Sequence, residues 1–233
     1  MRCGGVAVAA TLVCLAGLAQ AQETVRAKDF PAPDRPVAQI VSPEYSDEDT
    51  RDTRGEAERV LARLGIVRGQ RVADIGAGLG YYTVRVARRL GPGATLYATD
   101  VKAEYLGRLQ TRLAREEITG VHLILGQPRD PRLPAASIDV AILSHVYHEI
   151  ENPYEFFYRL RPSLAPGARV GILDMDRPTQ EHGTPPALLQ CELAAVGYRQ
   201  LDLVQLAPAD GYLAIFTPPD TLPSPRTIRA CRP

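Results

Sequence analysis

Strand-like and helical segments alternate along the chain from residue 54 to residue 196, and this alternation limits the possible folds more than any other feature. Short apolar runs predict strands at Arg71–Ile75, Ala94–Thr99, Val121–Leu125, Ile138–Leu143, Arg169–Leu173, Tyr198–Leu206 and Gly211–Thr217. Helical spacing of apolar residues or capping signals predict helices at Asp52–Leu64, Gly80–Leu90, Lys102–Glu117, Pro153–Arg161 and Ala187–Val196. Such alternation predicts an α/β fold with a doubly wound, mostly parallel sheet and helices on both faces.

The last two expected strands are joined by a short turn. They must run antiparallel, because a parallel neighbour needs a long crossover connection. The sequence therefore predicts seven strands, with one antiparallel strand near the edge of the sheet.

The first 21 residues have the pattern of an export signal. Arg2 precedes the apolar stretch Val6–Ala19, which is too short to span a bilayer comfortably, and Ala19-Gln20-Ala21 has the small-x-small pattern of a cleavage site. We therefore expect a periplasmic or secreted protein, with no stable membrane insertion after cleavage. A buried N-terminal helix or a wrongly assigned start is the alternative.

Composition divides the remaining chain into three parts. Residues 22–50 begin with a proline-rich stretch and are expected to form an extended N-terminal arm, residues 51–217 form the main domain, and residues 218–233 are expected to form a flexible tail. Cleavage of the signal would leave only Cys191 and Cys231. A disulfide between them is possible in an oxidising compartment, but one thiol in a helix and one in a loose tail favour two unpaired thiols.

The charge balance restricts the class of partner. Lys and Arg together number 27, as do Asp and Glu, so no basic excess points to nucleic acid or to an anionic membrane. We expect a small-molecule substrate and no nucleic-acid partner, and the sequence leaves the oligomeric state open.

A glycine-rich loop follows the first expected strand, in the stretch VADIGAGLGYYT. In doubly wound sheets ligands bind at the carboxyl ends of the strands, and glycines let backbone amides approach a ligand closely. The spacing of Gly76, Gly78 and Gly80 is G-x-G-x-G, which argues against the dinucleotide pattern G-x-G-x-x-G. Asp100 ends the second strand, where a carboxylate accepts hydrogen bonds from ribose hydroxyls; a helix cap is the alternative.

Four stretches together resemble class I S-adenosylmethionine-dependent methyltransferases: VADIGAGLGYYT, LYATD, LPAASIDVAILSHVYHEI and LRPSLAPGARVGILD. They occur in the order and spacing of that family, and the similarity spans about residues 54–217. The stretches SPEYSDEDTRD and HGTPPALLQCELAAVGYRQ are also similar to a subgroup of bacterial predicted methyltransferases, many of which carry signal peptides.

The resemblance implies S-adenosyl-L-methionine as the cofactor and assigns its contacts. The implied cofactor-binding residues are Asp74, Gly76, Gly78, Gly80, Asp100, Val101, Gln127 and Ser144. In this assignment Asp74 meets the amino end of the cofactor, Asp100 holds the ribose and Val101 packs on the adenine. Gln127 stands where the family often has an acid facing the adenine amino group; its side-chain oxygen can still accept a hydrogen bond, and Asp130 is an alternative partner.

Two of the four histidines, His145 and His148, lie just beyond the fourth expected strand. Either one is a candidate general base for removing a proton from the methyl acceptor, and a purely structural pairing role is the alternative. Asp174 and Asp176 follow the fifth strand, with His182 beyond them; they are interpreted as substrate-binding residues, solvated acids, or metal ligands together with His145 or His148. The preferred assignment contains no metal ligand.

The sequence therefore predicts an exported S-adenosylmethionine-dependent methyltransferase with an unknown, small-molecule acceptor. Extracytoplasmic compartments have no obvious supply of the cofactor, which keeps a non-catalytic binding protein with the same pocket as an alternative. A metal-dependent enzyme on the same fold is the other alternative, because the fold alone does not fix the function.

Overall fold

The computed structural model describes residues 25–41, 47–207 and 209–232, and the predicted export signal lies outside them. The described residues form a seven-stranded sheet in the order β3-β2-β1-β4-β5-β7-β6. Its strands are β1 Arg71–Ile75, β2 Thr95–Asp100, β3 Val121–Leu125, β4 Ile138–Ser144, β5 Leu164–Asp174, β6 Arg199–Gln205 and β7 Tyr212–Thr217. Strand β7 runs antiparallel to both of its neighbours and all other pairs are parallel, so the predicted sheet is confirmed.

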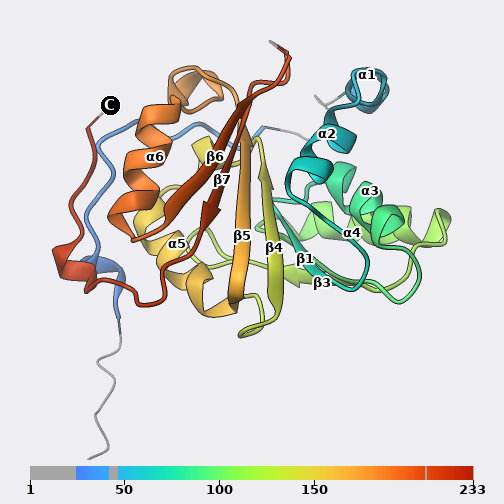
Figure 1. The fold of residues 1–233 in the computed structure, drawn as a ribbon, viewed down its shortest axis with the longest axis horizontal. Coiled ribbons are helices and arrows are strands. Elements are labelled where there is room, and N and C mark those ends of the chain that lie inside the picture. Colours follow the sequence, from blue (N-terminus) through green and yellow to red (C-terminus); the bar gives the residue numbers. More distant parts are fainter. Residues whose placement is uncertain (1–24, 42–46, 208, 233) are drawn as a thin grey trace, which may run out of the picture.

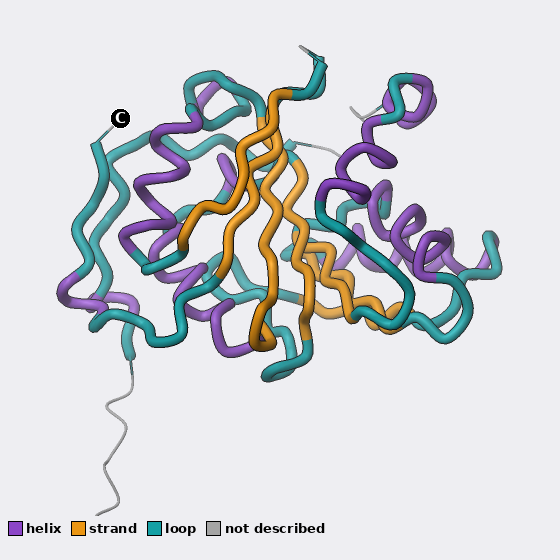
Figure 2. Tube along the Cα trace, viewed as in Figure 1, coloured by secondary structure: helices purple, strands orange, loops and turns teal. Residues whose placement is uncertain are grey.

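Helices cover both faces of this sheet (Figures 1 and 2). They are α1 Glu48–Thr53, α2 Glu56–Arg63, α3 Tyr81–Leu90, α4 Ala103–Arg115, α5 Pro153–Leu160 and α6 Pro186–Ala195. Helices α2, α3 and α4 lie on one side, and α5 and α6 lie on the other (Figure 1). Each side has its own apolar core, with Leu64 and Val86 in the first and Phe157 and Leu193 in the second.

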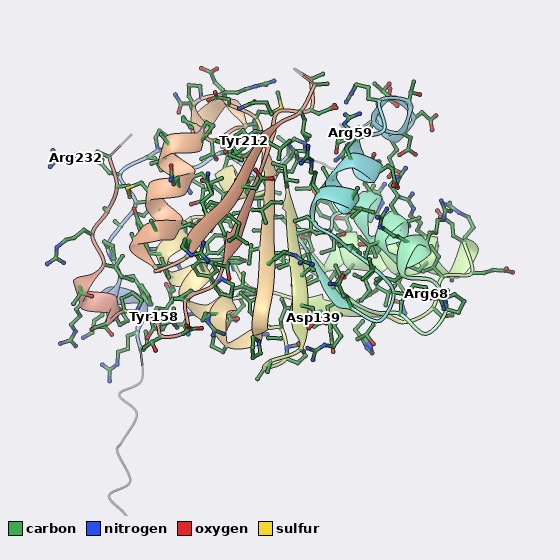
Figure 3. The ribbon with its side chains drawn as sticks, viewed as in Figure 1. Arg59, Arg68, Asp139, Tyr158, Tyr212 and Arg232 are labelled. Carbon is green, nitrogen blue, oxygen red and sulfur yellow. A yellow bond between two sulfur atoms is a disulfide. The ribbon has the colours of Figure 1, made fainter. Side chains whose placement is uncertain are left out.

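The two ends of the sheet are marked by Asp139 and Tyr212 (Figure 3). Asp139 is the second residue of β4, and Tyr212 pairs with Asp174, the last residue of β5. The carboxyl ends of the parallel strands therefore lie at the Tyr212 end, which is where a doubly wound sheet binds ligands.

The single helix predicted over Asp52–Leu64 is wrong, because the structure forms two helices there. Asp47 caps α1 by accepting a hydrogen bond from the Thr50 amide at 3.1 Å, and α2 begins after Gly55. Gly55 has a φ of +67°, which lies in the left-handed region that interrupts a right-handed helix. This break directs α1 away from the axis of α2.

The N-terminal arm runs in an extended path but packs against the α5 and α6 side of the molecule. Phe30 is buried in the core of that side, and Arg35 donates a hydrogen bond to the Glu192 carboxylate of α6 at 3.0 Å. Both side chains of this ion pair are almost fully buried. The arm is therefore packed onto the folded body at Phe30 and Arg35.

The expectation of a loose tail from Pro218 is wrong for the described residues, as is the preference for unpaired thiols. Cys231 forms a disulfide with Cys191 of α6, and its backbone amide donates a hydrogen bond to the Tyr154 hydroxyl at 2.8 Å. Ile228 is buried in the same core as Phe30. Figure 1 shows the N-terminal arm and this C-terminal segment side by side, and Arg226 is paired with Asp29 where they meet.

We find no helix in the described ranges with the length and apolar character needed to cross a membrane.

Candidate functional site

A cavity of about 550 Å³ lies at the carboxyl ends of β1, β2, β3 and β4. The residues from the strand ends that line it include Gly76, Ala77, Gly78, Asp100, Val101, Gln127, Ser144 and His145. Helices α1, α2 and α3 contribute further lining residues, among them Arg51, Glu56, Tyr81 and Tyr82. The cavity therefore occupies the position in the sheet where the order of the strands reverses, between β1 and β4.

The glycine loop is held open toward this cavity by the backbone of β2. The amides of Gly76 and Ala77 both donate to the Thr99 carbonyl, at 2.8 and 3.0 Å. Gly76 has a φ of +73°, and a Cβ there would lie 2.6 Å from Cγ2 of Val146. No larger side chain fits without displacing the neighbouring loop, so glycine is required for this close approach.

Gly80 has a packing role that the sequence analysis did not identify. It lies at the start of α3 and is absent from the described lining of the cavity. A Cβ at Gly80 would lie 2.3 Å from Cδ1 of Leu109 in α4. The third glycine of the motif thus permits α3 to pack against α4, and its contact with a cofactor stays a prediction.

Two carboxylates flank the glycine loop. Asp100 accepts hydrogen bonds from the amides of Gly78 and Lys102, each at 2.9 Å, so it orders the loop and also caps the entry into α4. Asp74 accepts a hydrogen bond from the Thr83 hydroxyl at 2.6 Å. Burial raises the pKa of Asp74 to about 6, because few groups nearby compensate a negative charge.

The residues expected near an adenine lie together at the ends of β2 and β3. Val101 and Gln127 both line the cavity, as does Tyr105, which the sequence analysis did not identify. Asp130 is absent from the described lining, and its carboxylate accepts a hydrogen bond from the Arg132 amide at 2.8 Å. Asp130 therefore stabilises its own turn, and Gln127 is the polar side chain that lies where an adenine is expected.

The two candidate bases separate into different surroundings. His145 lines the cavity, has a φ of +54° and places its Nδ1 atom 4.0 Å from the Asp174 carboxylate. Burial lowers the pKa of His145, so its imidazole is neutral at neutral pH. His148 is 2 % exposed and is absent from the described lining of the cavity. Of the two, only His145 is placed to contact a molecule in the cavity.

His148 is held by Asp174 behind the cavity wall. Its Nδ1 atom lies 2.9 Å from Oδ1 of Asp174, a fully buried residue that also accepts a hydrogen bond from the Thr184 hydroxyl at 2.8 Å. Asp176, which was grouped with Asp174 from the sequence, is exposed at the surface. Asp174 therefore accepts hydrogen bonds in the interior of the protein, whereas Asp176 is not part of this buried group.

A charged cluster from α1 and α2 completes the cavity and was missed by sequence reasoning. Arg51 donates to the Glu56 carboxylate at 3.0 Å and to the Ser144 hydroxyl at 3.3 Å. The Tyr82 hydroxyl also donates to Glu56, at 3.0 Å, and the Arg51 guanidinium lies 3.7 Å from the centre of the Tyr81 ring. The sequence contained a signal for this cluster. Glu56 is an acidic residue on the apolar face of the helix, one turn before Val60.

The cluster also sets the charge of Glu56. Burial alone pushes the pKa of Glu56 upward, but the Arg51 guanidinium outweighs it and leaves the pKa below its usual value. By contrast, Glu149 lines the same cavity without an arginine partner, and burial raises its pKa to about 7.

The order of the strands and the position of the cavity are those of the class I methyltransferase fold. Residues 73–170 match the family described as a methyltransferase domain, and this segment carries strands β1 to β4, most of β5 and the glycine loop. A solved S-adenosylmethionine-dependent methyltransferase from Aquifex aeolicus superposes with a TM-score of 0.65 over 72% of this chain and 90% of its own, at 21% identity. At that identity the likeness shows the fold.

The chain is also similar to proteins of known activity over part of its length. It is 29% identical to trans-aconitate 2-methyltransferase of Mycobacterium tuberculosis over 113 residues, which are 48% of this chain and 40% of that protein. It is 30% identical to ribosomal RNA small subunit methyltransferase A of Burkholderia cenocepacia over 104 residues, which are 44% of this chain and 38% of that protein. The chain therefore spans less than half the length of these relatives.

Proposed function

We propose that this chain is an S-adenosylmethionine-dependent methyltransferase that acts on a small-molecule acceptor. The observation that carries the proposal is the contact between Asp100 and the Gly78 amide at the mouth of the β1 loop, 2.9 Å apart and inside the cavity lining. This contact places a carboxylate beside the glycine-rich backbone that lines the cavity. Such a pair suits a ligand with a ribose and an adjacent charged chain.

The residues present fit the cofactor. In this assignment the Asp100 carboxylate accepts hydrogen bonds from the two ribose hydroxyls, and the Gly76 to Gly78 backbone lies along the methionine part. Asp74 lies deeper in the same cavity, where its carboxylate can meet the ammonium group. Val101 and Tyr105 supply apolar surface for the adenine, and the Gln127 side-chain oxygen accepts a hydrogen bond from its amino group.

Methyl transfer requires that the acceptor be positioned against the cofactor and that a proton be removed from the acceptor. The bound cofactor would supply a methyl group on a positively charged sulfur, ready for in-line displacement by the acceptor. His145 supplies the general base in this proposal, because it lines the cavity and its lowered pKa keeps the imidazole neutral. Ser144 and Arg51, joined by a hydrogen bond, form the neighbouring wall against which an acceptor is oriented.

The charge of the cavity supports a small acceptor over a nucleic acid. Carboxylates outnumber guanidinium groups along its described lining, the acids being Asp47, Glu48, Glu56, Asp74, Asp100, Glu149 and Glu151. A protein that binds nucleic acid needs basic groups to neutralise phosphates, and the chain as a whole has no basic excess. The trans-aconitate relative supports a small acceptor, whereas the ribosomal RNA relative is the competing precedent.

Export is part of the proposal. It rests on the signal-like pattern of residues 1–21, and the disulfide between Cys191 and Cys231 supports it. Structural disulfides persist in oxidising compartments and are rare in the cytosol. N-terminal sequencing of the native protein is the direct test: we expect a chain that begins at Gln22, and an intact N-terminus on a soluble cytoplasmic protein would contradict export.

Calorimetric titration with S-adenosylmethionine tests the core of the proposal. We expect the wild-type chain to bind the cofactor and Asp100→Ala to lose about 1.5–3 kcal/mol for each hydrogen bond to the ribose. Asp130→Ala is the matched control, because Asp130 lies in the following loop outside the described lining. Equal affinity in wild type and Asp100→Ala, with both chains folded, would show that the assigned site is wrong.

Turnover separates an enzyme from a binding protein. A chain that binds the cofactor and produces S-adenosylhomocysteine with some member of a panel of small acceptors is an enzyme. Tight binding without product across the panel would instead favour a protein that retains the cofactor without catalysis.

A further inference from the structure

A second cluster of possible ligand groups lies behind the cavity wall, formed by His148, Glu149 and His182. One ligand atom from each residue lies within 4.8 Å of the other two. His148 and Glu149 belong to the 3-10 helix Tyr147–Glu149, and His182 follows the 3-10 helix Thr179–Glu181. The cluster therefore joins two short segments that are separated in sequence and follow β4 and β5.

We propose that His148, Glu149 and His182 bind one divalent transition-metal ion. Two imidazole nitrogens and one carboxylate oxygen form a ligand set suited to zinc, cobalt, nickel or iron, whereas calcium and magnesium prefer ligands that are all oxygen. The site depends only on these side chains, and it stands whether or not the cavity holds the proposed cofactor.

The orientation of His148 is fixed in the way expected of a metal ligand. The Asp174 carboxylate only accepts hydrogen bonds, so Nδ1 of His148 carries the proton that it donates across 2.9 Å. This leaves Nε2 with its lone pair free. A histidine that donates one ring N–H to a carboxylate while the other nitrogen holds a metal is a recurring arrangement, and the carboxylate strengthens the ligand.

His182 supplies an independent observation. Its Nδ1 atom is buried and has no hydrogen-bond partner among the residues that the structure describes. A buried polar nitrogen without a partner is costly, so an unpaired one calls for an explanation such as an ion. The His182 ring packs edge-on to the His148 ring, with centroids 5.5 Å apart, which brings the two imidazoles to one place.

Glu149 completes the set with a carboxylate oxygen that has no hydrogen-bond partner among the described residues. Oε1 accepts a hydrogen bond from the Val41 amide at 3.2 Å, and no hydrogen bond to Oε2 is found within the described part of the chain. The carboxylate is thus partly desolvated and is held in place by the N-terminal arm.

The spacing of the ligand atoms requires a small closure on binding. With bonds of about 2.0–2.2 Å, a tetrahedral ion holds its ligand atoms roughly 3.4 Å apart. The three side chains therefore need to move together by a fraction of their present separation, within the range of rotamer adjustment.

A site with three protein ligands leaves a coordination position for water or for an oxygen of another molecule. Since Glu149 also lines the cavity, the ion would border the space where an acceptor binds.

Cobalt titration of the chain without a polyhistidine tag tests the proposal. After chelator treatment, we expect wild-type protein to bind one Co²⁺ per chain with a visible absorption band typical of nitrogen and oxygen ligands. His182→Ala and Glu149→Gln should each weaken binding by roughly tenfold or more. Zn²⁺ should raise the melting temperature of wild type and leave that of His182→Ala unchanged, because only a folded site is stabilised by its ligand.

His122→Ala is the matched control, because His122 is an exposed histidine of β3 whose ring stacks on Tyr97. It should bind Co²⁺ as wild type does. His148→Gln provides a fourth variant, and since His148 is buried its folding is checked by circular dichroism; if it does not fold, the other two variants decide. Absence of binding to wild type would overturn the proposal, as would equal binding by wild type, His182→Ala and Glu149→Gln.

Discussion

The imidazole of His148 and the carboxylate of Asp174 are in direct contact, with Nδ1 and Oδ1 2.9 Å apart and both side chains buried. Asp174 also accepts hydrogen bonds from the Thr184 hydroxyl and from the Met175 amide. One carboxylate at the end of β5 thus ties together the turn after β4 and the loop before α6. The acid that the sequence suggested as a substrate or metal ligand acts as a structural acceptor.

Asp174→Asn is expected to lower the free energy of unfolding by about 1–3 kcal/mol, because an amide cannot accept all three hydrogen bonds and its NH2 group lacks an acceptor. Chemical denaturation measures this. Asp176→Asn is the control and should change stability by less than about 0.5 kcal/mol, since Asp176 is exposed. If the proposed ion binds, Asp174→Asn should also weaken Co²⁺ by about 10–100-fold. Equal stability of the two variants would contradict the assigned role.

His145→Ala is expected to reduce turnover by about 10²–10⁴ while leaving the affinity for S-adenosylmethionine nearly unchanged, because the base contacts the acceptor. The lowered pKa of His145 adds a pH criterion: wild-type activity should persist below pH 6.5, since the imidazole stays neutral there. Turnover and calorimetric affinity are measured on the same preparations. Full activity in His145→Ala would remove the histidine from the mechanism and leave positioning alone.

The raised pKa of Asp74 predicts that cofactor affinity depends on pH. Below about pH 6 the buried carboxyl is protonated and cannot attract an ammonium group, so affinity should rise as pH increases through 6. Below the pKa of Asp74, the cofactor affinity should change by at most about tenfold per pH unit. In the chain without ligand, the free energy of unfolding should fall as the pH rises from 3.8 to about 6. In this range the Asp74 carboxyl keeps its proton in the folded chain and loses it in the unfolded chain. Asp74→Asn should remove both slopes, and calorimetry and melting at several pH values measure them.

Arg51→Met is expected to cost about 3–5 kcal/mol of stability, because it leaves the buried Glu56 carboxylate without its cation. The double variant Arg51→Met/Glu56→Gln should recover much of the loss, since it removes the unpaired charge. Arg63→Met, on the exposed side of α2, is the control and should be nearly neutral. A double variant as unstable as Arg51→Met would indicate that packing of the guanidinium on Tyr81 dominates.

Reduction of the disulfide is expected to lower the free energy of unfolding by about 2–4 kcal/mol, because it frees a loop in the unfolded chain. The two cysteines are 40 positions apart in sequence. The double variant Cys191→Ser/Cys231→Ser serves as the control and should melt at the same temperature with and without reductant. An identical melting temperature for oxidised and reduced wild type would show that the bond adds no stability.

Local patterns in the sequence were sufficient to predict the sheet and the position of the cavity. Strands such as β1 and β4 are short and mostly apolar, and the glycines after β1 mark the turn toward the ligand site. Gly76 and Asp100 both line the cavity, and their positions follow from the ends of β1 and β2 in the motif. The packing role of Gly80 could not be predicted, because it depends on Leu109 in the next helix.

Features that depend on distant contacts could not be predicted. Whether His145 or His148 faces the cavity depends on the turn of the chain after β4, where His145 takes a left-handed conformation and His148 folds back onto Asp174. The burial of Arg35 and Phe30 depends on α5 and α6 being in place, and no local pattern in the arm indicates it. The disulfide was left open for the same reason, because sequence spacing does not show whether two cysteines meet.

The buried pair of Arg35 and Glu192 has a consequence for the timing of transport. Its partners are 157 positions apart, so the arm closes onto the body only after α6 has been synthesised. If the chain is exported, the predicted cut after Ala21 lies only a short distance before the buried Phe30. For an exported chain, docking of the arm against α6 would therefore follow synthesis of most of the chain.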